Sequence, residues 1–438
     1  MIGVAVAVAA VAAAASGPHL ADPHPCPGVP GFSCSTLTVP LDRSGRVPGT
    51  LALGVAAEND ARPPRGVLLF LTGGPGQSGV PYAGRLARTL ARAAPGYRIV
   101  VYDQRGTGGT ALRCPALQRQ LGSSDLFAPT ATAVRACGAA IGRARGLYGT
   151  DDVVADMDDL RRALRARELT LDGVSYGTYV AERYALAYPT HVERMVLDSV
   201  VPHAFGPALV PVELHAVARV LALACGTSRC ASDLAAVVRK RGDGVDVLAA
   251  LTLLSIVDPT YRDVFDVPAI LHDARLGRPA PLARMVATTR RWSAAPAAAL
   301  SQGLHAAALC SDWRFPWGDS TAPLTGRERA LRRFAAAVPL ASLWPFDRAT
   351  LTGNGFVREC LAWPPAAPTP PALQRLPPVP TLLLSGDRDL STPLEWARRE
   401  AAAAPRGRLL VVHGAGHSIQ SRSHDIGALQ AVSAFLNR

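Results

Sequence analysis

The sequence predicts an α/β protein with a mostly parallel central sheet and an inserted helical segment. Short apolar segments, among them "GVLLFLTGGPG" (66–76) and "YRIVVYDQRGTG" (97–108), alternate with stretches of helical periodicity. From 202 to 377 the chain is Ala-rich and helical in pattern, and no apolar strand is evident. The alternation resumes with "VPTLLLSGDRD" (379–389) and "RLLVVHGAGH" (408–417). A helical insertion inside an alternating sheet is expected to be a cap.

The chain opens with an apolar run from Ile2 to Ala15, followed by small residues and Pro-rich polar sequence. This run is too short to span a bilayer comfortably, and its last three alanines offer an A-x-A cleavage site. We therefore expect a secretory signal peptide over residues 1–15 and a secreted or extracytoplasmic protein without stable membrane insertion. No Lys or Arg precedes the run, which leaves a misassigned start codon as the alternative.

The core is expected to comprise residues 16–201 and 378–438, and the cap residues 202–377. At the start of the core, "CSTLTVPLD" and "GTLALGVAAEND" predict an antiparallel hairpin that opens a mixed sheet. A helix is expected over residues 150–167, with Thr150 as its N-cap.

The segment "LDGVSYGTYV" (171–180) places Ser175 where an apolar strand becomes a helix. Gly173 and Gly177 flank this serine in the spacing G-x-S-x-G, which is typical of a nucleophile elbow. At such an elbow the strand and the helix come so close that side chains at both flanking positions would clash. The alternative is an ordinary strand-to-helix turn with a solvated serine, so the choice depends on partner residues.

A serine nucleophile needs a base and a third group that orients the base. His417 follows the last apolar strand between two glycines, and Asp389 follows the strand before it. The order Ser175, Asp389, His417 is the one expected of α/β-hydrolases. His413 and Asp387 compete for the last two roles, and we favour His417 and Asp389.

The developing oxyanion of an acyl transfer needs hydrogen-bond donors. The glycines of "TGGPG", at the end of an apolar strand, leave backbone N–H groups accessible. We expect the N–H of Gly74 and the N–H of Tyr176, the residue after the nucleophile, to serve as the two donors.

The formal net charge is +12, which alone would suggest nucleic acid as a partner. The basic residues are almost all Arg and are scattered among Ala, Gly and Pro, whereas a groove that tracks a nucleic-acid backbone needs a continuous basic stripe. We therefore expect no nucleic-acid partner. No grouping of Cys and His has the spacing of zinc ligands, so neither a metal nor another cofactor is expected.

Taken together, these segments resemble the secreted tripeptidyl aminopeptidases and related proline iminopeptidases of the α/β-hydrolase superfamily. The likeness runs along nearly the whole mature chain and rests on "CSTLTVPLD", "GGPGQSG", "YDQRGTG", "GVSYGTYVAERYALAYP", "ALCSDW", "CLAWP", "SGDRDLSTPLEWA" and "HGAGHS". The resemblance implies Ser175, Asp389 and His417 as a catalytic triad, the GGPG loop as the oxyanion hole, and hydrolysis of peptides from a free N-terminus. Thr72 and "TGGT" (107–110) depart from the family pattern and put the substrate in doubt rather than the chemistry.

An aminopeptidase must also recognise an α-ammonium group, which calls for carboxylates or carbonyls under the cap. Asp312 in "CSDW" and Glu359 beside Cys360 are the candidates, because a disulfide between Cys310 and Cys360 would hold both near one place. The alternative is that both acids pair with surface arginines.

The predicted function is an exported serine exopeptidase that releases tripeptides or single residues, and an esterase or amidase of the same superfamily is the second candidate.

Eight cysteines allow 105 full pairings. Local spacing together with the family likeness predicts sequential pairs: Cys26 with Cys34, Cys114 with Cys137, Cys225 with Cys230, and Cys310 with Cys360.

Overall fold

A computed structural model describes the chain except for residues 1–16, 60–62, 367–374 and 424. The expected signal peptide lies outside the described residues. Within them, nine strands form one sheet in the order β1-β2-β3-β5-β4-β6-β7-β8-β9. The strands are β1 (Leu20–Pro25), β2 (Phe32–Pro40), β3 (Thr50–Glu58), β4 (Val67–Leu71), β5 (Arg98–Tyr102), β6 (Leu169–Val174), β7 (Val192–Asp198), β8 (Thr381–Gly386) and β9 (Gly407–Val412).

The sheet is parallel from β5 through β4, β6, β7 and β8 to β9, and antiparallel where β1, β2, β3 and β5 pair. The predicted mixed sheet and its opening hairpin are therefore present. The sequence analysis missed β1, whose residues "LADPHP" contain two prolines and are mostly exposed. Such a segment forms a strand only at the edge of the sheet, where the Pro that lacks an N–H is tolerated.

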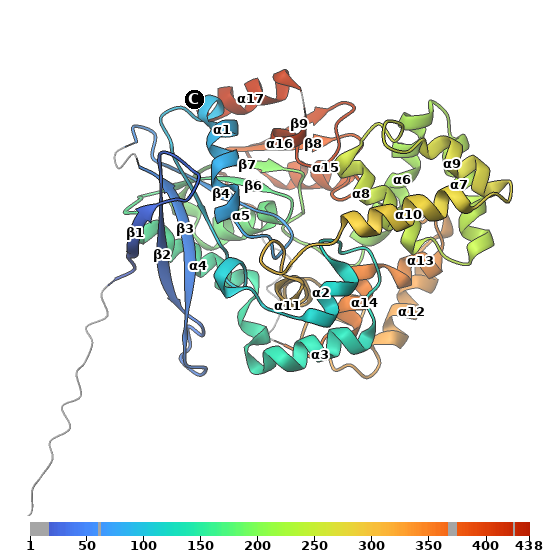
Figure 1. Cartoon of the computed structure of the whole chain (residues 1–438), viewed down its shortest axis with the longest axis horizontal. Coiled ribbons are helices and arrows are strands. Elements are labelled where there is room, and N and C mark those ends of the chain that lie inside the picture. The colour runs from blue at the N-terminus through green and yellow to red at the C-terminus, as the bar shows by residue number, and fades with distance from the viewer. Residues whose placement is uncertain (1–16, 60–62, 367–374, 424) are drawn as a thin grey trace, which may run out of the picture.

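Successive residues of a strand point to opposite faces of the sheet. Because the parallel strands carry apolar residues in succession, both faces of this part of the sheet are apolar. Leu68 and Ile99 belong to one core, and Leu69 and Val100 to the other. The first face is covered by α1 (Ala83–Ala93), α16 (Ile419–Arg422) and α17 (Ile426–Leu436), and the second by α4 (Thr150–Ala163), α5 (Tyr176–Ala187) and α15 (Leu394–Ala403) (Figure 1).

Between β7 and β8 the described residues contain only helices, turns and isolated bridges. These helices are α6 (Leu209–Cys225), α7 (Arg229–Arg241), α8 (Val245–Val257), α9 (Val267–Arg275), α10 (Ala280–Trp292), α11 (Gln302–Asp312), α12 (Arg327–Ala337), α13 (Arg348–Gly353) and α14 (Gly355–Ala362). In Figure 1, α6 to α10 form a group beside the sheet. We call this segment, residues 209–362, the helical insertion.

Two further helices, α2 (Pro115–Leu121) and α3 (Ala131–Ile141), lie between β5 and α4 and pack against α11 and α14 of the insertion (Figure 1). Helices that precede β6 in the sequence thus pack against helices that follow β7. The expected division into a core of residues 16–201 and 378–438 and a cap of residues 202–377 stays a proposal.

Four disulfides are present, Cys26–Cys34, Cys114–Cys137, Cys225–Cys230 and Cys310–Cys360, and they are the pairs that the sequence analysis predicts. The last of them joins α11 to α14 within the insertion. Among the helices that the structure describes, none is long and apolar enough to cross a bilayer.

Candidate active site

Ser175 stands on the sharp turn between β6 and α5. Its backbone has φ 57° and ψ −126°, a conformation that non-glycine residues rarely adopt. The turn is held by the N–H of Ser175, which donates to the carbonyl of Asp198 at 2.9 Å, and by the carbonyl of Ser175, which accepts the N–H and the hydroxyl of Thr178 at 2.9 and 2.7 Å. Strain of this kind is typical of a nucleophile elbow.

The two flanking glycines have no room for a side chain. A Cβ on Gly173 would lie 2.5 Å from the carbonyl oxygen of Gly177, and a Cβ on Gly177 would lie 2.2 Å from the carbonyl oxygen of Leu71. Both contacts are far shorter than van der Waals contact, so the close approach of strand and helix requires glycine at both positions.

His417 and Asp389 lie on loops at the ends of β9 and β8, and the ring Nδ1 of His417 contacts Asp389 Oδ2 at 2.9 Å. Asp389 is fully buried and accepts the N–H groups of Ser391 and Thr392 at 2.8 and 3.0 Å. Burial disfavours a charged ring on His417, but the Asp389 carboxylate outweighs it and raises the pKa of His417 above its ordinary value. A base oriented in this way by a buried acid fits the second and third roles of a triad.

The competing pair lies elsewhere. Asp387 Oδ2 contacts His413 Nδ1 at 2.9 Å, and its Oδ1 accepts the N–H of Gly414 at 2.8 Å. The His413 side chain is 87% exposed and does not line the cavity that contains Ser175. The two acids are thus each committed to a different histidine.

Asp198, at the end of β7, fastens the segment that follows His417. Its carboxylate accepts the N–H groups of Ile419 and Gln420, each at 2.8 Å, and burial raises its pKa despite these bonds. The hydroxyl of its neighbour Ser199 accepts the N–H of Ser418 at 2.7 Å. The sequence analysis missed this role, because nothing in "LDSVV" shows that two loops meet there.

Helix α8 of the insertion fastens the loops of both partners of Ser175. The carbonyl of Ser255 accepts the N–H of His417 at 3.3 Å, and its hydroxyl accepts the N–H of Leu390 at 3.2 Å. A Cβ on Gly416 would lie 1.7 Å from the same Ser255 oxygen. The insertion therefore takes part in positioning the site and does not only cover it.

The predicted oxyanion donors lie beside Ser175. A Cβ on Gly73 would lie 2.9 Å from the Ser175 Cβ, and Gly73 and Gly74 both line the cavity at Ser175. Gly74 has φ +108°, which a side chain would strain. Tyr176 is the first residue of α5, so its N–H has no acceptor within the helix.

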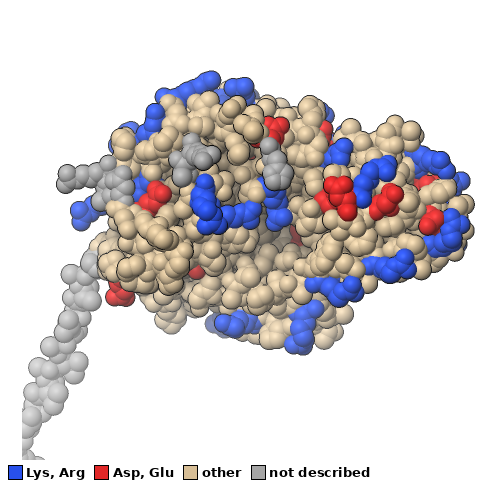
Figure 2. All heavy atoms as spheres, turned by 45° about the horizontal axis from the view of Figure 1, so that its top comes forward, with Lys and Arg blue, Asp and Glu red and all other residues tan. Residues whose placement is uncertain are grey.

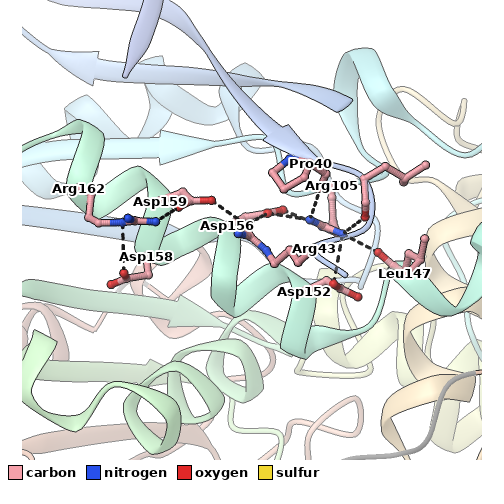
Figure 3. A network of polar contacts seen from close by, with 10 residues as sticks. Pro40, Arg43, Arg105, Leu147, Asp152, Asp156, Asp158, Asp159 and Arg162 are labelled. Atoms are coloured by element: carbon pink, nitrogen blue, oxygen red, sulfur yellow. Dashed lines mark hydrogen bonds and ion pairs between the residues drawn. The ribbon is translucent and has the colours of Figure 1, made fainter. Parts of the chain in front are cut away.

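Arg105, of the segment "YDQRGTG", holds the loop after β5 (Figure 3). Its fully buried guanidinium donates from Nε and Nη2 to Asp156, each at 2.7 Å, and from Nη1 to the carbonyl of Leu147 at 2.7 Å. In the same loop, Asp103 accepts the N–H groups of Gly79 and Val80, just after the GGPG loop, at 2.8 and 3.0 Å. The segment "YDQRGTG" thus holds the GGPG loop, which carries the expected oxyanion donor Gly74.

A cavity of about 510 Å³ contains Ser175 and His417 together. Its wall is formed by the loop after β4, α1, the loop between α2 and α3, α8, the segment before α11, and α16. This volume lies in the range of ligand-binding pockets.

Asp312 and Glu359 do not line this cavity. Asp312 accepts the Tyr176 hydroxyl at 2.7 Å, the N–H of Thr150 at 2.9 Å and the hydroxyl of Thr150 at 2.5 Å. Burial raises the pKa of Asp312 to about 6 in spite of these bonds.

The expectation that Thr150 caps α4 is wrong: the helix begins at Thr150, its N-cap is Gly149, and the Thr150 side chain bonds Asp312 instead.

Glu359 is buried and its Oε2 contacts the ring Nδ1 of His305 at 3.0 Å. His305 does line the cavity, and so does Asp125, from the loop between α2 and α3. Asp125 forms no ion pair with any Arg, Lys or His of the described residues. The sequence analysis missed Asp125, because "GSSDLF" carries no signal of its place.

One group of possible metal ligands occurs among the residues that the structure describes: Glu182, His203 and Glu400, whose ligand atoms lie within 4.8 Å of one another. None of them lines the cavity at Ser175. His203 Nδ1 contacts Glu400 Oε1 at 2.5 Å. Two ligands of one ion, each about 2.1 Å from it, lie roughly 3 Å or more apart, so the two side chains bind each other in place of an ion.

Comparisons with known proteins agree with this fold. Residues 66–218 match the family described as alpha/beta hydrolase fold, and residues 347–438 match the family described as TAP-like protein. Residues 66–218 therefore form an α/β-hydrolase domain, and residues 347–438 a TAP-like domain.

Over 190 residues the chain is 32% identical to a tripeptidyl aminopeptidase of Streptomyces lividans, an alignment that covers 39% of this chain and 35% of that protein. The chain thus spans about a third of the length of the first curated relatives that it matches. It is 27% identical to the serine protease Hip1 of Mycobacterium tuberculosis (strain ATCC 25618 / H37Rv) over 440 residues, covering 89% of this chain and 82% of that protein. A hydrolase structure from Pseudomonas aeruginosa PA01 aligns with a TM-score of 0.42 at 17% identity, covering 92% of this chain and 98% of that one.

Proposed function

We propose that this protein is an exported serine exopeptidase that releases tripeptides or other short peptides from free N-termini through an acyl-enzyme. The observation that carries the proposal is one cavity lined by Ser175 and His417 and also by Asp125, a carboxylate with no ion-pair partner among the described residues. The names of the relatives, a tripeptidyl aminopeptidase and a serine protease, support the same class. The disulfides support an oxidising compartment.

In this proposal the Ser175 hydroxyl attacks the carbonyl carbon of the scissile peptide bond, while His417 Nε2 takes the hydroxyl proton. Asp389 holds the ring through Nδ1 and stabilises the imidazolium that forms. The N–H groups of Gly74 and Tyr176 bind the oxyanion. His417 then gives the proton to the leaving amine, and a water molecule, activated by the same histidine, hydrolyses the ester on Ser175.

The amine-binding role falls to Asp125 in place of Asp312 and Glu359. Asp125 lines the cavity, whereas the oxygens of Asp312 are occupied by Thr150 and Tyr176. Glu359 acts through His305, whose pKa is lowered by burial but raised more by Glu359 and Asp125. An ammonium group could pair with the carboxylate of Asp125, which forms no ion pair among the described residues.

The test compares tripeptidyl p-nitroanilides with free and N-acetylated N-termini. We expect the free amine to be strongly preferred, and Asp125→Asn to raise KM for it about tenfold without affecting any turnover of the acetylated substrate. Asp263→Asn, at an exposed aspartate outside the cavity, is the matched control. Equal turnover of acetylated peptides, or cuts within long chains, would show that no N-terminus is recognised. Faster turnover of p-nitrophenyl esters than of any peptide would favour an esterase.

A further inference from the structure

The cavity at Ser175 also carries two arginines, Arg85 at the start of α1 and Arg422 at the end of α16. Neither forms an ion pair with a carboxylate in the part of the chain that the structure describes. Arg85 donates from Nη2 to the carbonyl of Ser421 at 2.7 Å, which holds it beside Arg422. Figure 2 shows basic side chains gathered beside a hollow near the middle of the molecule.

These two guanidinium groups lie close to each other, and both side chains remain exposed to solvent. Partial desolvation and the positive charge of Arg85 lower the pKa of Arg422 below its ordinary value. Arg43 and Arg105, by contrast, have the carboxylate of Asp156 between them. Two adjacent positive charges without such a partner form a site for an anion.

The acidic and the basic residues come from different parts of the cavity wall: Arg85 and Arg422 from α1 and α16, and Asp125 from the loop between α2 and α3. The charge of Arg422 lowers the pKa of His417, so it lies within electrostatic reach of the base. Asp125 instead raises the pKa of His305 and of Glu213. Because His417 delivers the proton to the leaving amine, we expect the leaving fragment on the side of the wall where α16, which directly follows His417, carries Arg422.

We propose that Arg85 and Arg422 bind a carboxylate of the leaving fragment, so that the preferred substrates are short peptides with a negative charge shortly after the scissile bond. This inference rests on the proposed peptidase function. The carboxylate has two possible sources: the C-terminus of a short peptide, or an Asp or Glu side chain just after the cut. Arginine suits both, because its planar fork pairs with a carboxylate through two hydrogen bonds.

The test uses three tetrapeptides with the same first three residues: Ala-Ala-Ala-Ala as the free acid, the same peptide as the C-terminal amide, and Ala-Ala-Ala-Asp amide. Products are quantified by mass spectrometry to give kcat/KM. We expect the free acid to exceed the neutral amide about tenfold, and Arg422→Gln or Arg85→Gln to remove most of this ratio. Arg408→Gln, at an exposed arginine outside the cavity, should leave the ratio unchanged. Recovery of the rate by the Asp amide would assign the site to side-chain carboxylates as well.

Two further readouts separate this inference from the proposed function. A tripeptidyl p-nitroanilide has a neutral leaving group, so its turnover should change less than about threefold in either arginine variant. If that turnover persists while the free acid and both amides react equally in the wild-type protein, the carboxylate site is wrong and the peptidase stands. If no peptide and no p-nitroanilide is cleaved, the peptidase proposal itself is wrong.

Discussion

The carbonyl oxygen of Ser255, in a helix of the insertion, accepts the backbone N–H of His417 at 3.3 Å. Through this contact a segment far away in the sequence sets the position of the proposed catalytic base. Gly416 makes the contact possible, because a side chain there would collide with the same oxygen.

Gly416→Ala should therefore displace the His417 loop. We expect a loss of about 10²-fold or more in kcat, since small shifts of a catalytic group have effects of this size. Gly206→Ala, where an added Cβ meets nothing within 4 Å, is the control and should retain activity. Full activity of the Gly416 variant would mean that Ser255 does not position the base.

Asp389→Asn should lower kcat by about 10⁴-fold, because an amide no longer favours the productive tautomer of His417. Asp387→Asn should have only a few-fold effect, since its partner is the exposed His413. Loss of the Asp389 charge also removes the main cause that raises the pKa of His417, so the acidic limb of any residual kcat/KM profile should move to lower pH. The opposite ranking of the two variants would move the orienting acid to Asp387.

Asp312→Asn should lower kcat about equally for free and N-acetylated substrates. Its carboxylate bonds the side chain of Tyr176, whose N–H is a proposed oxyanion donor, and it does not reach the cavity. We expect a loss of about tenfold, less than the loss from removing a donor outright. A rise in KM confined to free amines would instead restore Asp312 as the amine-binding acid.

Asp172 should make the protein less stable as pH rises. It is fully buried in β6, and burial raises its pKa to about 8, above the ordinary value of 3.8 for an aspartate. Between these two pH values the unfolded chain has lost the proton and the folded protein keeps it, so the free energy of unfolding falls as pH increases, by at most about 1.4 kcal/mol per pH unit.

Asp172→Asn removes this titration and can still accept the hydrogen bond that Gln420 Nε2 donates at 2.8 Å. The free energy of unfolding is measured with urea at about pH 5 and about pH 8. Relative to the wild-type protein, the variant should be more stable at the higher pH than at the lower one. Asp263→Asn serves as the surface control. A difference that is the same at both pH values would contradict the assignment of a protonated Asp172.

Local patterns were enough to predict the central elements of the fold and of the site. Gly173, Ser175 and Gly177 lie within five residues, so the strand-to-helix turn is encoded in one short segment. Asp389 and His417 follow apolar strands directly, and parallel strands bring their C-terminal ends to one edge of the sheet. The resemblance to a known family supported the preference for Asp389 and, together with local spacing, the disulfide pairs.

The rest depends on contacts between distant segments. The role of Asp312 at Tyr176, the contact of Ser255 with His417 and the place of Asp125 in the cavity all come from packing across more than a hundred residues or between loops. Strand β1 has the composition of a loop and forms only because β2 offers an unpaired edge. No periodicity in the sequence carries such information.

The central claim is that Ser175 is the nucleophile of a peptidase. The most direct test is turnover of a free-amine tripeptidyl p-nitroanilide by the wild-type protein and by Ser175→Ala, together with intact mass after treatment with a fluorophosphonate. We expect the wild-type protein to gain one adduct, mapped to Ser175, and the folded variant to gain none and to lose about 10³-fold or more in kcat. A variant that keeps a tenth of the wild-type activity, or an adduct on another residue, would contradict the claim.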